Sequence, residues 1–167
     1  LEEIDSAVKF KLGFPMGIFE LADFTGMDVI HKATVEMHLR DKKVINPHKI
    51  VEKMFDAKKL GQKSGEGYYK YSDDKYERVE LSEELAQKCN PIQLIANVLN
   101  NAAWLITNGA SDIEEIEKAA KLGLGLRKPL FETAKEIGIQ NIIDELNKLT
   151  ETYGEFYKPD PLLETMI

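Results

Sequence analysis

The feature that most constrains this chain is an internal repeat. At an offset of 112 residues, segment 2–55 aligns with segment 114–167 without a gap. The first copy begins EEIDSAVKFKLG and the second EEIEKAAKLGLG, and 12 of the 29 residues at positions 2–30 are identical between them. Shared helical periodicity alone gives similar residue classes, but seldom this many identities in one ungapped register. We therefore interpret the chain as two copies of one unit.

The two copies are incomplete in complementary ways. The stretch NPIQLIANVLNNAAWLITNGASD precedes the second copy only, and DAKKLGQKSGEGYYKY follows the first copy only. We expect the sequence to be a window from a longer polypeptide; a natural protein with two incomplete repeats is the alternative. The predicted organisation is a first helical repeat at 1–71 without its leading helix, a polar connector at 72–90, and a second repeat at 91–167 without its closing glycine loop.

Helical periodicity dominates both copies. Ser111 or Asp112 is expected to cap a helix that has acidic residues in its first turn and lysines toward its end. The longest helix is expected over 91–109, with Trp104 as an anchor between helices. Pro47 is expected to open a helix that runs to about Lys59, because proline suits a first turn. Strand signals are confined to GYYKYS, so the predicted fold class is all-α, with two tandem related helical units and no Rossmann sheet.

Composition excludes some partners. The net charge is −7 and the sequence pI is about 5.1, which argues against nucleic acid or an anionic membrane surface as a partner. No stretch has the roughly 18 to 20 apolar residues that a membrane span needs. The single cysteine, Cys89, cannot form an internal disulfide, and this favours a cytoplasmic location.

The stretch KSGEGYYKY, residues 63–71, resembles a phosphate-binding loop at first sight, because two glycines one residue apart follow a lysine and a serine, but it lacks the spacing of a P-loop. A dinucleotide-binding fingerprint needs a buried strand before its glycines and a helix after them. Here a helix is expected before the glycines and aromatic residues follow, which is the reverse order. We interpret the stretch as a glycine turn that folds its tyrosines back onto the helices.

The same residues carry a family resemblance. LGQKSGEGYYKY resembles the closing K-T-G-x-G-F-Y motif of 3-hydroxyacyl-CoA dehydrogenases, and LGFPMGIFELADFTGMD resembles their G-x-P-M-G-P-F-E-L-x-D-x-x-G-L-D signature. The second copy is similar to the duplicate helical domain of longer family members. The resemblance covers nearly the whole chain, and it implies a helical fold like the C-terminal domain of 6-phosphogluconate dehydrogenase.

The resemblance also implies what this sequence lacks. In the family, NAD and a catalytic histidine–glutamate pair belong to a Rossmann domain, and a catalytic asparagine lies on a helix ahead of the segment that corresponds to EEID. The sequence contains neither segment, so no residue here is assigned a catalytic role. Some family members are fused to an enoyl-CoA hydratase, so the resemblance also allows a hydratase in the parent protein.

The candidate substrate-binding residues lie in one apolar loop and the helix after it. By resemblance, Phe14, Pro15, Met16, Gly17 and Leu21 face a cleft that holds the acyl-CoA thioester and its chain. Apolar walls suit an acyl chain, since each buried CH₂ group is worth about 0.8 kcal/mol. A purely structural role, with Pro15 and Gly17 shaping a turn and Phe14 and Met16 filling the core, is equally compatible with the composition.

The other candidates favour structural roles. His31 and His38 share a helical face but lie about 10 Å apart along the axis, too far to bind one zinc ion, so no metal site is expected. His48 is expected at a helix start. Glu20 recurs as Glu132, and a polar contact at a helix end explains this better than acid catalysis.

These observations predict an enzyme fragment. We expect the chain to be part of an NAD-dependent 3-hydroxyacyl-CoA dehydrogenase of fatty-acid β-oxidation, which forms part of the acyl-CoA cleft and a homodimer or domain interface and is inactive without the NAD-binding domain. One alternative is a free-standing, non-enzymatic helical interaction module. The other is the helical half of a dehydrogenase for hydroxy acids that are not CoA thioesters.

Overall fold

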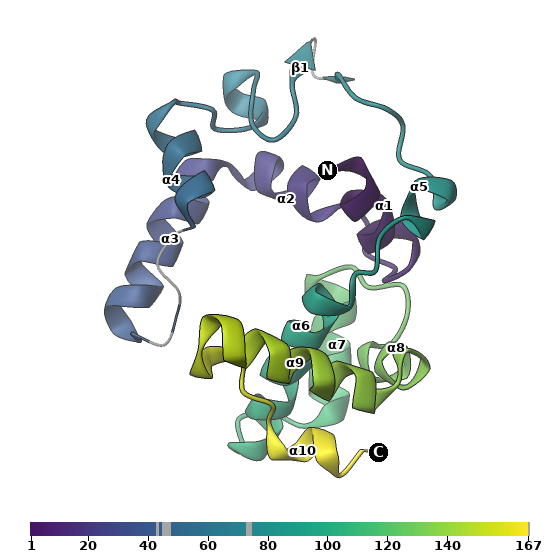
Figure 1. Cartoon of the computed structure of the whole chain (residues 1–167). Coiled ribbons are helices and arrows are strands. Elements are labelled where there is room, and N and C mark those ends of the chain that lie inside the picture. Colours follow the sequence, from purple (N-terminus) through teal and green to yellow (C-terminus); the bar gives the residue numbers. More distant parts are fainter. Residues whose placement is uncertain (43, 45–47, 73–74, 167) are drawn as a thin grey trace.

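The computed structural model describes residues 1–42, 44, 48–72 and 75–166, which are mainly helical (Figure 1). The first copy contains α1 (Glu2–Phe10), α2 (Ile18–Thr25), α3 (Met27–Arg40) and α4 (Lys49–Asp56). The second copy contains α7 (Ile113–Gly123), α8 (Leu130–Ile137), α9 (Ile139–Tyr153) and α10 (Pro161–Glu164). Each helix of the first copy therefore has a counterpart in the second, and the predicted all-α class with two related units is confirmed.

Helix α6 (Ile92–Thr107) leads into the second unit and forms the centre of its core (Figure 1). It packs against α8, α9 and α10. The apolar residues of this core belong to one continuous cluster, which includes Ile95, Leu99, Leu130, Ile142, Leu146 and Leu163. The second unit is therefore built around a helix that precedes its repeated part.

The prediction that Trp104 anchors α6 between helices is wrong. The buried face of α6 carries Ile95, Leu99 and Ala103, at helical spacing, whereas Trp104 is 56% exposed. The reason is geometric, because the next residue along a helix is rotated by about 100°. Trp104 therefore points away from the face on which Ala103 packs.

Single glycines join the second and third helices of each unit. Gly26 separates α2 from α3 with φ of 97°, and Gly138 separates α8 from α9 with φ of 92°. This positive φ is unfavourable for residues with a Cβ, which explains why glycine occurs at both junctions. The N–H groups of Gly26 and Gly138 donate to the carbonyls of Ala22 and Ala134, respectively.

The last helix of each unit begins at a side-chain cap. His48 Nδ1 accepts a hydrogen bond from the Ile50 N–H, and the Asp160 carboxylate accepts one from the Leu162 N–H. The prediction that His48 starts a helix is confirmed, whereas Pro47 lies outside the described residues. This helix ends at Asp56, earlier than predicted.

An acidic side chain from the first helix of each unit caps the second helix. The Asp5 carboxylate accepts hydrogen bonds from the N–H groups of Phe19 and Glu20, at 2.8 and 3.1 Å. Its counterpart Glu117 accepts from the N–H groups of Leu130 and Phe131, both at 2.8 Å. Because free N–H groups at a helix start attract negative charge, these caps fix α2 against α1 and α8 against α7.

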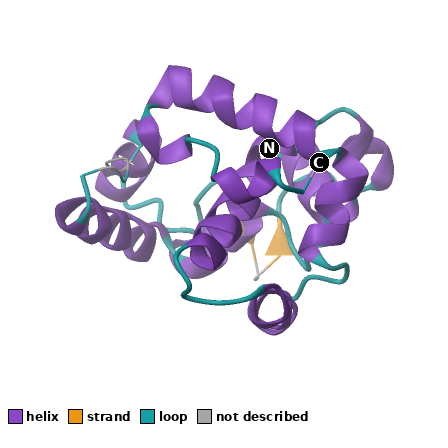
Figure 2. Ribbon diagram, turned by 90° about the horizontal axis from the view of Figure 1, so that it is seen from below, coloured by secondary structure: helices purple, strands orange, loops and turns teal. Residues whose placement is uncertain are grey.

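The connection between the units packs onto the first unit. Its two short strands, β1 (Tyr71–Ser72) and β2 (Lys75–Tyr76), pair antiparallel and are the strand segments visible in Figure 2. Helix α5 (Glu83–Gln87) then lies against α1, where the Ser82 N–H donates to the Ser6 hydroxyl at 3.3 Å. None of the described helices combines the length and apolar character needed to cross a bilayer.

Candidate functional site

The loop between α1 and α2 borders a cavity of about 510 Å³ at the seam between the two units. From the first unit, the cavity is lined by Val8, Leu12, Phe14, Met16, Gly17, Ile18 and Leu21. From the second unit, the lining includes Leu94, Asn97, Val98, Leu149, Tyr153 and Tyr157. Most of these side chains are apolar, so the cavity suits an apolar group of a ligand.

Four of the five predicted substrate-binding residues meet at this cavity, namely Phe14, Met16, Gly17 and Leu21. Leu21 is 42% exposed, so its side chain is accessible from solvent. The fifth residue, Pro15, is exposed and is not part of the lining. Its ring lies on the seam instead, where its Cγ is 3.1 Å from the position that a Cβ on Gly125 would occupy.

The sequence did not point to Asn97 as a site residue. It lies on α6, and its Oδ1 atom is buried without a hydrogen-bond partner among the described residues. A buried acceptor without a donor is unfavourable by about 1–3 kcal/mol. Asn97 and the tyrosines of the second unit were missed because only the contact between the units brings them to the loop at 12–17.

Close packing holds this loop in place. A Cβ added to Gly17 would lie 2.1 Å from Asp5 Cγ, so no other residue fits there without movement. The Gly17 N–H donates to Glu20 Oε2 at 2.7 Å. The predicted polar role of Glu20 at a helix end is thus confirmed, and the start of α2 is already occupied by the carboxylates of this chain.

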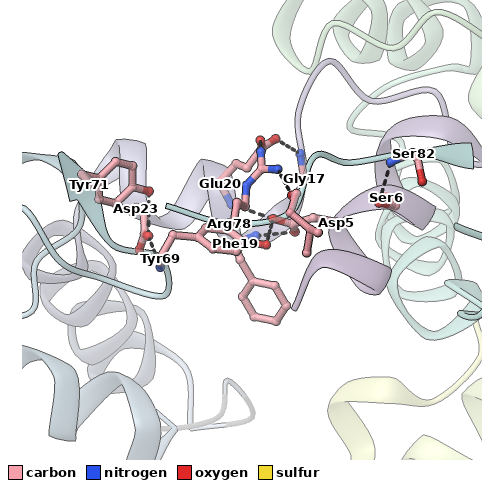
Figure 3. Close-up of polar contacts among 11 residues, drawn as sticks. Asp5, Ser6, Gly17, Phe19, Glu20, Asp23, Tyr69, Tyr71, Arg78 and Ser82 are labelled. Carbon is pink, nitrogen blue, oxygen red and sulfur yellow. Dashed lines mark hydrogen bonds and ion pairs between the residues drawn. The ribbon is translucent and has the colours of Figure 1, made fainter. Parts of the chain in front are cut away.

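The glycine loop at 61–71 is fixed by another buried acid, Asp23 (Figure 3). Its carboxylate accepts hydrogen bonds from the N–H groups of Tyr68 and Tyr69 and from the Tyr71 hydroxyl, each at 2.8 Å. The Tyr69 hydroxyl reaches further and donates to Asp5 Oδ2 at 2.8 Å. The prediction that the tyrosines fold back onto the helices is confirmed.

Arg78 from the connector completes this buried cluster (Figure 3). Its guanidinium pairs with the Glu20 carboxylate, and the two side chains are only 9% and 8% exposed. The guanidinium carbon also lies 4.4 Å from the centre of the Tyr76 ring and 5.1 Å from that of Tyr69. We refer to Asp5, Glu20, Asp23, Tyr69, Tyr71 and Arg78 as the carboxylate–tyrosine cluster.

Burial changes the protonation of this cluster. It raises the pKa of the Asp5 carboxyl above its usual 3.8, while hydrogen bonds from the Phe19 N–H and the Tyr69 hydroxyl partly oppose the rise. Burial also raises the pKa of the Tyr69 and Tyr71 hydroxyls, and their hydrogen bonds to Asp5 and Asp23 add to this effect. Both hydroxyls keep their protons and act as donors, so the cluster is suited to holding the loop rather than to proton transfer.

The glycine loop does not fit a dinucleotide. A Cβ added to Gly67 would lie 2.1 Å from Asp23 Oδ1, so the space beside the glycine is filled by a carboxylate of the chain itself. The N–H groups of Tyr68 and Tyr69 in this loop are already bonded to the Asp23 carboxylate. Among the described residues, no group of three or more histidine, cysteine, aspartate or glutamate side chains is arranged to hold a metal ion.

The sequence also matches a family model, that of the 3-hydroxyacyl-CoA dehydrogenase C-terminal domain, over residues 1–71 and 93–167. The chain belongs to this family. The two matched segments contain the cavity loop, the glycine loop and all four helices of the second copy.

Curated relatives are similar to part of the chain. Rat mitochondrial hydroxyacyl-coenzyme A dehydrogenase is 40% identical over 72 residues, which are 42% of this chain and 23% of the rat protein. A probable 3-hydroxyacyl-CoA dehydrogenase of Caenorhabditis elegans is 38% identical over 73 residues, which are 42% of this chain and 24% of that protein. The aligned region thus amounts to about a quarter of each relative's length.

Two solved structures share the fold of the whole chain. The 3-hydroxybutyryl-CoA dehydrogenase of Escherichia coli matches 99% of this chain and 54% of its own, with a TM-score of 0.74 and 20% identity. The dehydrogenase part of multifunctional enzyme 1 from C. elegans matches 99% of this chain and 41% of its own, with a TM-score of 0.65 and 22% identity. At these identities the likeness extends to the fold, including the tandem arrangement of the two units.

Proposed function

We propose that the chain is the helical part of an NAD-dependent 3-hydroxyacyl-CoA dehydrogenase. The main support is the family match, which covers both units. The parent enzyme would transfer hydride between the 3-hydroxyl carbon of an acyl-CoA and NAD, as a step of fatty-acid β-oxidation. The proton-transfer groups would lie in a separate NAD-binding domain, because the buried acids and tyrosines here are occupied in holding loops.

NAD would be held by that other domain. The residues described here do not fit it, since the glycine loop binds Asp23 and the sheet consists of two strands of two residues each. We therefore derive no step through NAD on this chain. The purified chain is expected to give no NADH with a 3-hydroxyacyl-CoA, and any catalysed formation of NADH would contradict this division of roles.

The cavity at the seam is the proposed contact with the acyl chain. Phe14, Met16 and Leu21 supply apolar surface, and the Gly17 N–H is held by Glu20 Oε2. Each CH₂ group that enters such a cavity contributes about 0.8 kcal/mol, so binding should strengthen with chain length until the cavity is full. Pro15 would shape the loop from its position on the seam, and a direct contact with substrate stays a prediction for this residue.

Displacement of a bound fluorescent fatty acid tests the cavity. Acyl-CoAs of increasing chain length are expected to displace the probe, whereas free 3-hydroxybutyrate should not; the reverse would favour a dehydrogenase for small hydroxy acids. Leu21→Gln should weaken displacement by about tenfold, since it places an amide in an apolar wall. Leu39→Gln is the matched control, because Leu39 is 60% exposed on α3 and does not line the cavity.

The assembly and location of the protein are also proposals. We propose packing against the NAD-binding domain and a homodimer contact through exposed apolar side chains of α2 and α3, among them Phe24 at 66% exposure. Sedimentation analysis of the chain and of Phe24→Asp would test the dimer.

A cytoplasmic location remains our prediction. It should be checked with a fluorescent fusion, because relatives are described as mitochondrial. A fused hydratase also remains a prediction, which sequencing of the parent gene would test.

A further inference from the structure

The cavity at the seam contains a polar atom that a plain alkyl chain would leave without a partner. Asn97 on α6 is half-buried and belongs to the lining. Its Oδ1 atom is buried and accepts no hydrogen bond from the described residues. Buried oxygens in folded proteins are usually paired, because an acceptor without a donor is unfavourable. A ligand in the cavity is therefore a suitable source of the missing donor.

The other polar side chains of the lining are less suited to select a ligand. Gln93 is exposed, and its amide donates to Glu145 Oε1 at 2.8 Å. Tyr153 is 61% exposed, and its ring centre lies 6.0 Å from that of Tyr157. Among the described lining residues, Asn97 is thus the one with a buried side-chain oxygen or nitrogen that has no partner.

A trapped water would be a poor donor at this position. A stable buried water needs about two to four polar partners. On α6, the lining residues nearest to Asn97 in the sequence are Leu94 and Val98, and α9 adds Leu149 to the same lining. A hydroxyl on an alkyl chain needs fewer polar partners than a water, because the rest of the chain contacts these aliphatic side chains.

We propose that the cavity binds acyl chains that carry a hydroxyl group, and that Asn97 Oδ1 accepts a hydrogen bond from this hydroxyl. The inference rests on the proposed function, since it requires the acyl chain to lie in the cavity. The hydroxyl is not the one at which hydride transfer would occur, because the proton-transfer groups are assigned to the separate NAD-binding domain. It is a second hydroxyl further along the chain, and Asn97 is a specificity-determining residue for it.

One such acceptor is enough to change the preference of an apolar cavity. Where no acceptor is available, a hydroxyl loses its hydrogen bonds to water on binding and gains none, so the plain chain binds more tightly. With Asn97 present, the hydroxyl regains a hydrogen bond and the amide oxygen gains its donor. A plain chain would leave that oxygen unpaired, which disfavours the ligand that lacks the hydroxyl.

Displacement of a fluorescent fatty acid from the chain measures this preference. The competitors are saturated fatty acids and their derivatives with a single hydroxyl at successive positions beyond the third carbon. For at least one position, the hydroxylated acid is expected to bind at least as tightly as its parent. In Asn97→Leu, the ratio of the two dissociation constants should shift against that acid by at least about tenfold. Asn101→Leu, at an exposed position of α6, is the matched control and should leave the ratio unchanged.

A methyl ether of the best hydroxylated acid tests the donor directly. The ether oxygen cannot donate a hydrogen bond, so the ether is expected to bind the wild-type chain at least about tenfold more weakly than the hydroxylated acid. The difference should largely disappear in Asn97→Leu, which separates the lost donor from the size of the added methyl group. An ether that binds the wild-type chain as tightly as the hydroxylated acid would refute the proposal.

The outcomes also separate this inference from the proposed function. If plain acids displace the probe but Asn97→Leu shifts the ratio at no hydroxyl position, the inference is wrong while the acyl contact stands. If Asn97→Leu weakens binding of plain acyl-CoAs and not of plain acids, the donor is an amide of the CoA arm, and the inference is again wrong. If neither the probe nor any acid binds, the inference and the proposed acyl contact fail together.

Discussion

The Asp23 carboxylate lies so close to Gly67 that a Cβ at position 67 would be 2.1 Å from Asp23 Oδ1. The glycine is required here by the approach of an acid and not by its backbone angle, since positive φ is found instead at neighbouring Gly61 and Gly65. This loop resembles a phosphate-binding loop, but the anion that it binds is a side chain of the protein itself. This contact links α2 to the loop before β1.

Gly67→Ala is expected to destabilise the chain by more than about 2 kcal/mol, because Asp23 must move and lose hydrogen bonds from buried donors. Gly65→Ala is the matched control. Its φ is 76° and no atom would lie within 4 Å of the new Cβ, so only backbone strain of about 1–2 kcal/mol is expected. Urea denaturation of both variants measures the difference, and an equal loss in both would contradict the close-contact explanation.

Arg78→Met is expected to cost about 3–5 kcal/mol of unfolding free energy, because it leaves the Glu20 carboxylate buried without its cation. The double variant Arg78→Met, Glu20→Gln should recover most of this loss. A glutamine oxygen can still accept the Gly17 N–H, while the uncompensated charge is gone. If the double variant is as unstable as Arg78→Met alone, the ion pair is not the origin of the effect.

The pH dependence of stability should separate a buried acid from an exposed one. The pKa of Asp5 is raised in the folded state, so its contribution to stability is complete below its ordinary pKa of 3.8 and is lost as pH rises through the raised value. The wild type should therefore lose stability relative to Asp5→Asn as pH increases from about 4 to 7.

Asp28 should behave in the opposite way. Its pKa is lowered by the hydrogen bond from Lys63, so its contribution is present above the ordinary pKa and lost as pH falls. The wild type should thus gain stability relative to Asp28→Asn as pH rises. Thermal melts across the pH range measure both differences, and slopes of the same sign would refute the assignment. High salt should weaken only the Asp28 effect, because that pair is exposed.

Asn97→Leu is expected to raise the unfolding free energy by about 1 kcal/mol, since it replaces a buried, unpartnered acceptor with apolar surface. It should also strengthen binding of an alkyl probe in the cavity. Asn101→Leu, at an exposed position of the same helix, is the control and should change neither quantity. Destabilisation by Asn97→Leu would mean that the oxygen has a partner in solution.

The sequence predicted the parts of the fold that depend on local pattern. The repeat register located equivalent helices, the cap at Asp112 was one of two that ordinary helix chemistry offered, and His48 was expected at a helix start although its side-chain cap was not. The loop at 12–17 was also found from its motif, although the composition could not separate core from cleft. These features are encoded within a few residues of where they act.

The missed features depend on contacts between distant segments. Arg78 was assigned to a polar connector, yet it lies beside Glu20, which is 58 residues away in the sequence. Asn97 reaches the cavity only because the second unit packs on the first. Trp104 was misplaced because hydrophobic character alone does not show which side of an uncharged helix with scattered polar residues will be buried.

The two acidic caps have a consequence for how the halves can diverge. Glu117 is one methylene longer than Asp5 and binds helix N–H groups that begin one position earlier in the repeat register. Each cap is formed by residues of one unit only, so a substitution in one unit leaves the cap of the other unit intact. The two caps therefore act independently. Residues around the cavity in one unit can change while the other unit keeps its own capped helix pair.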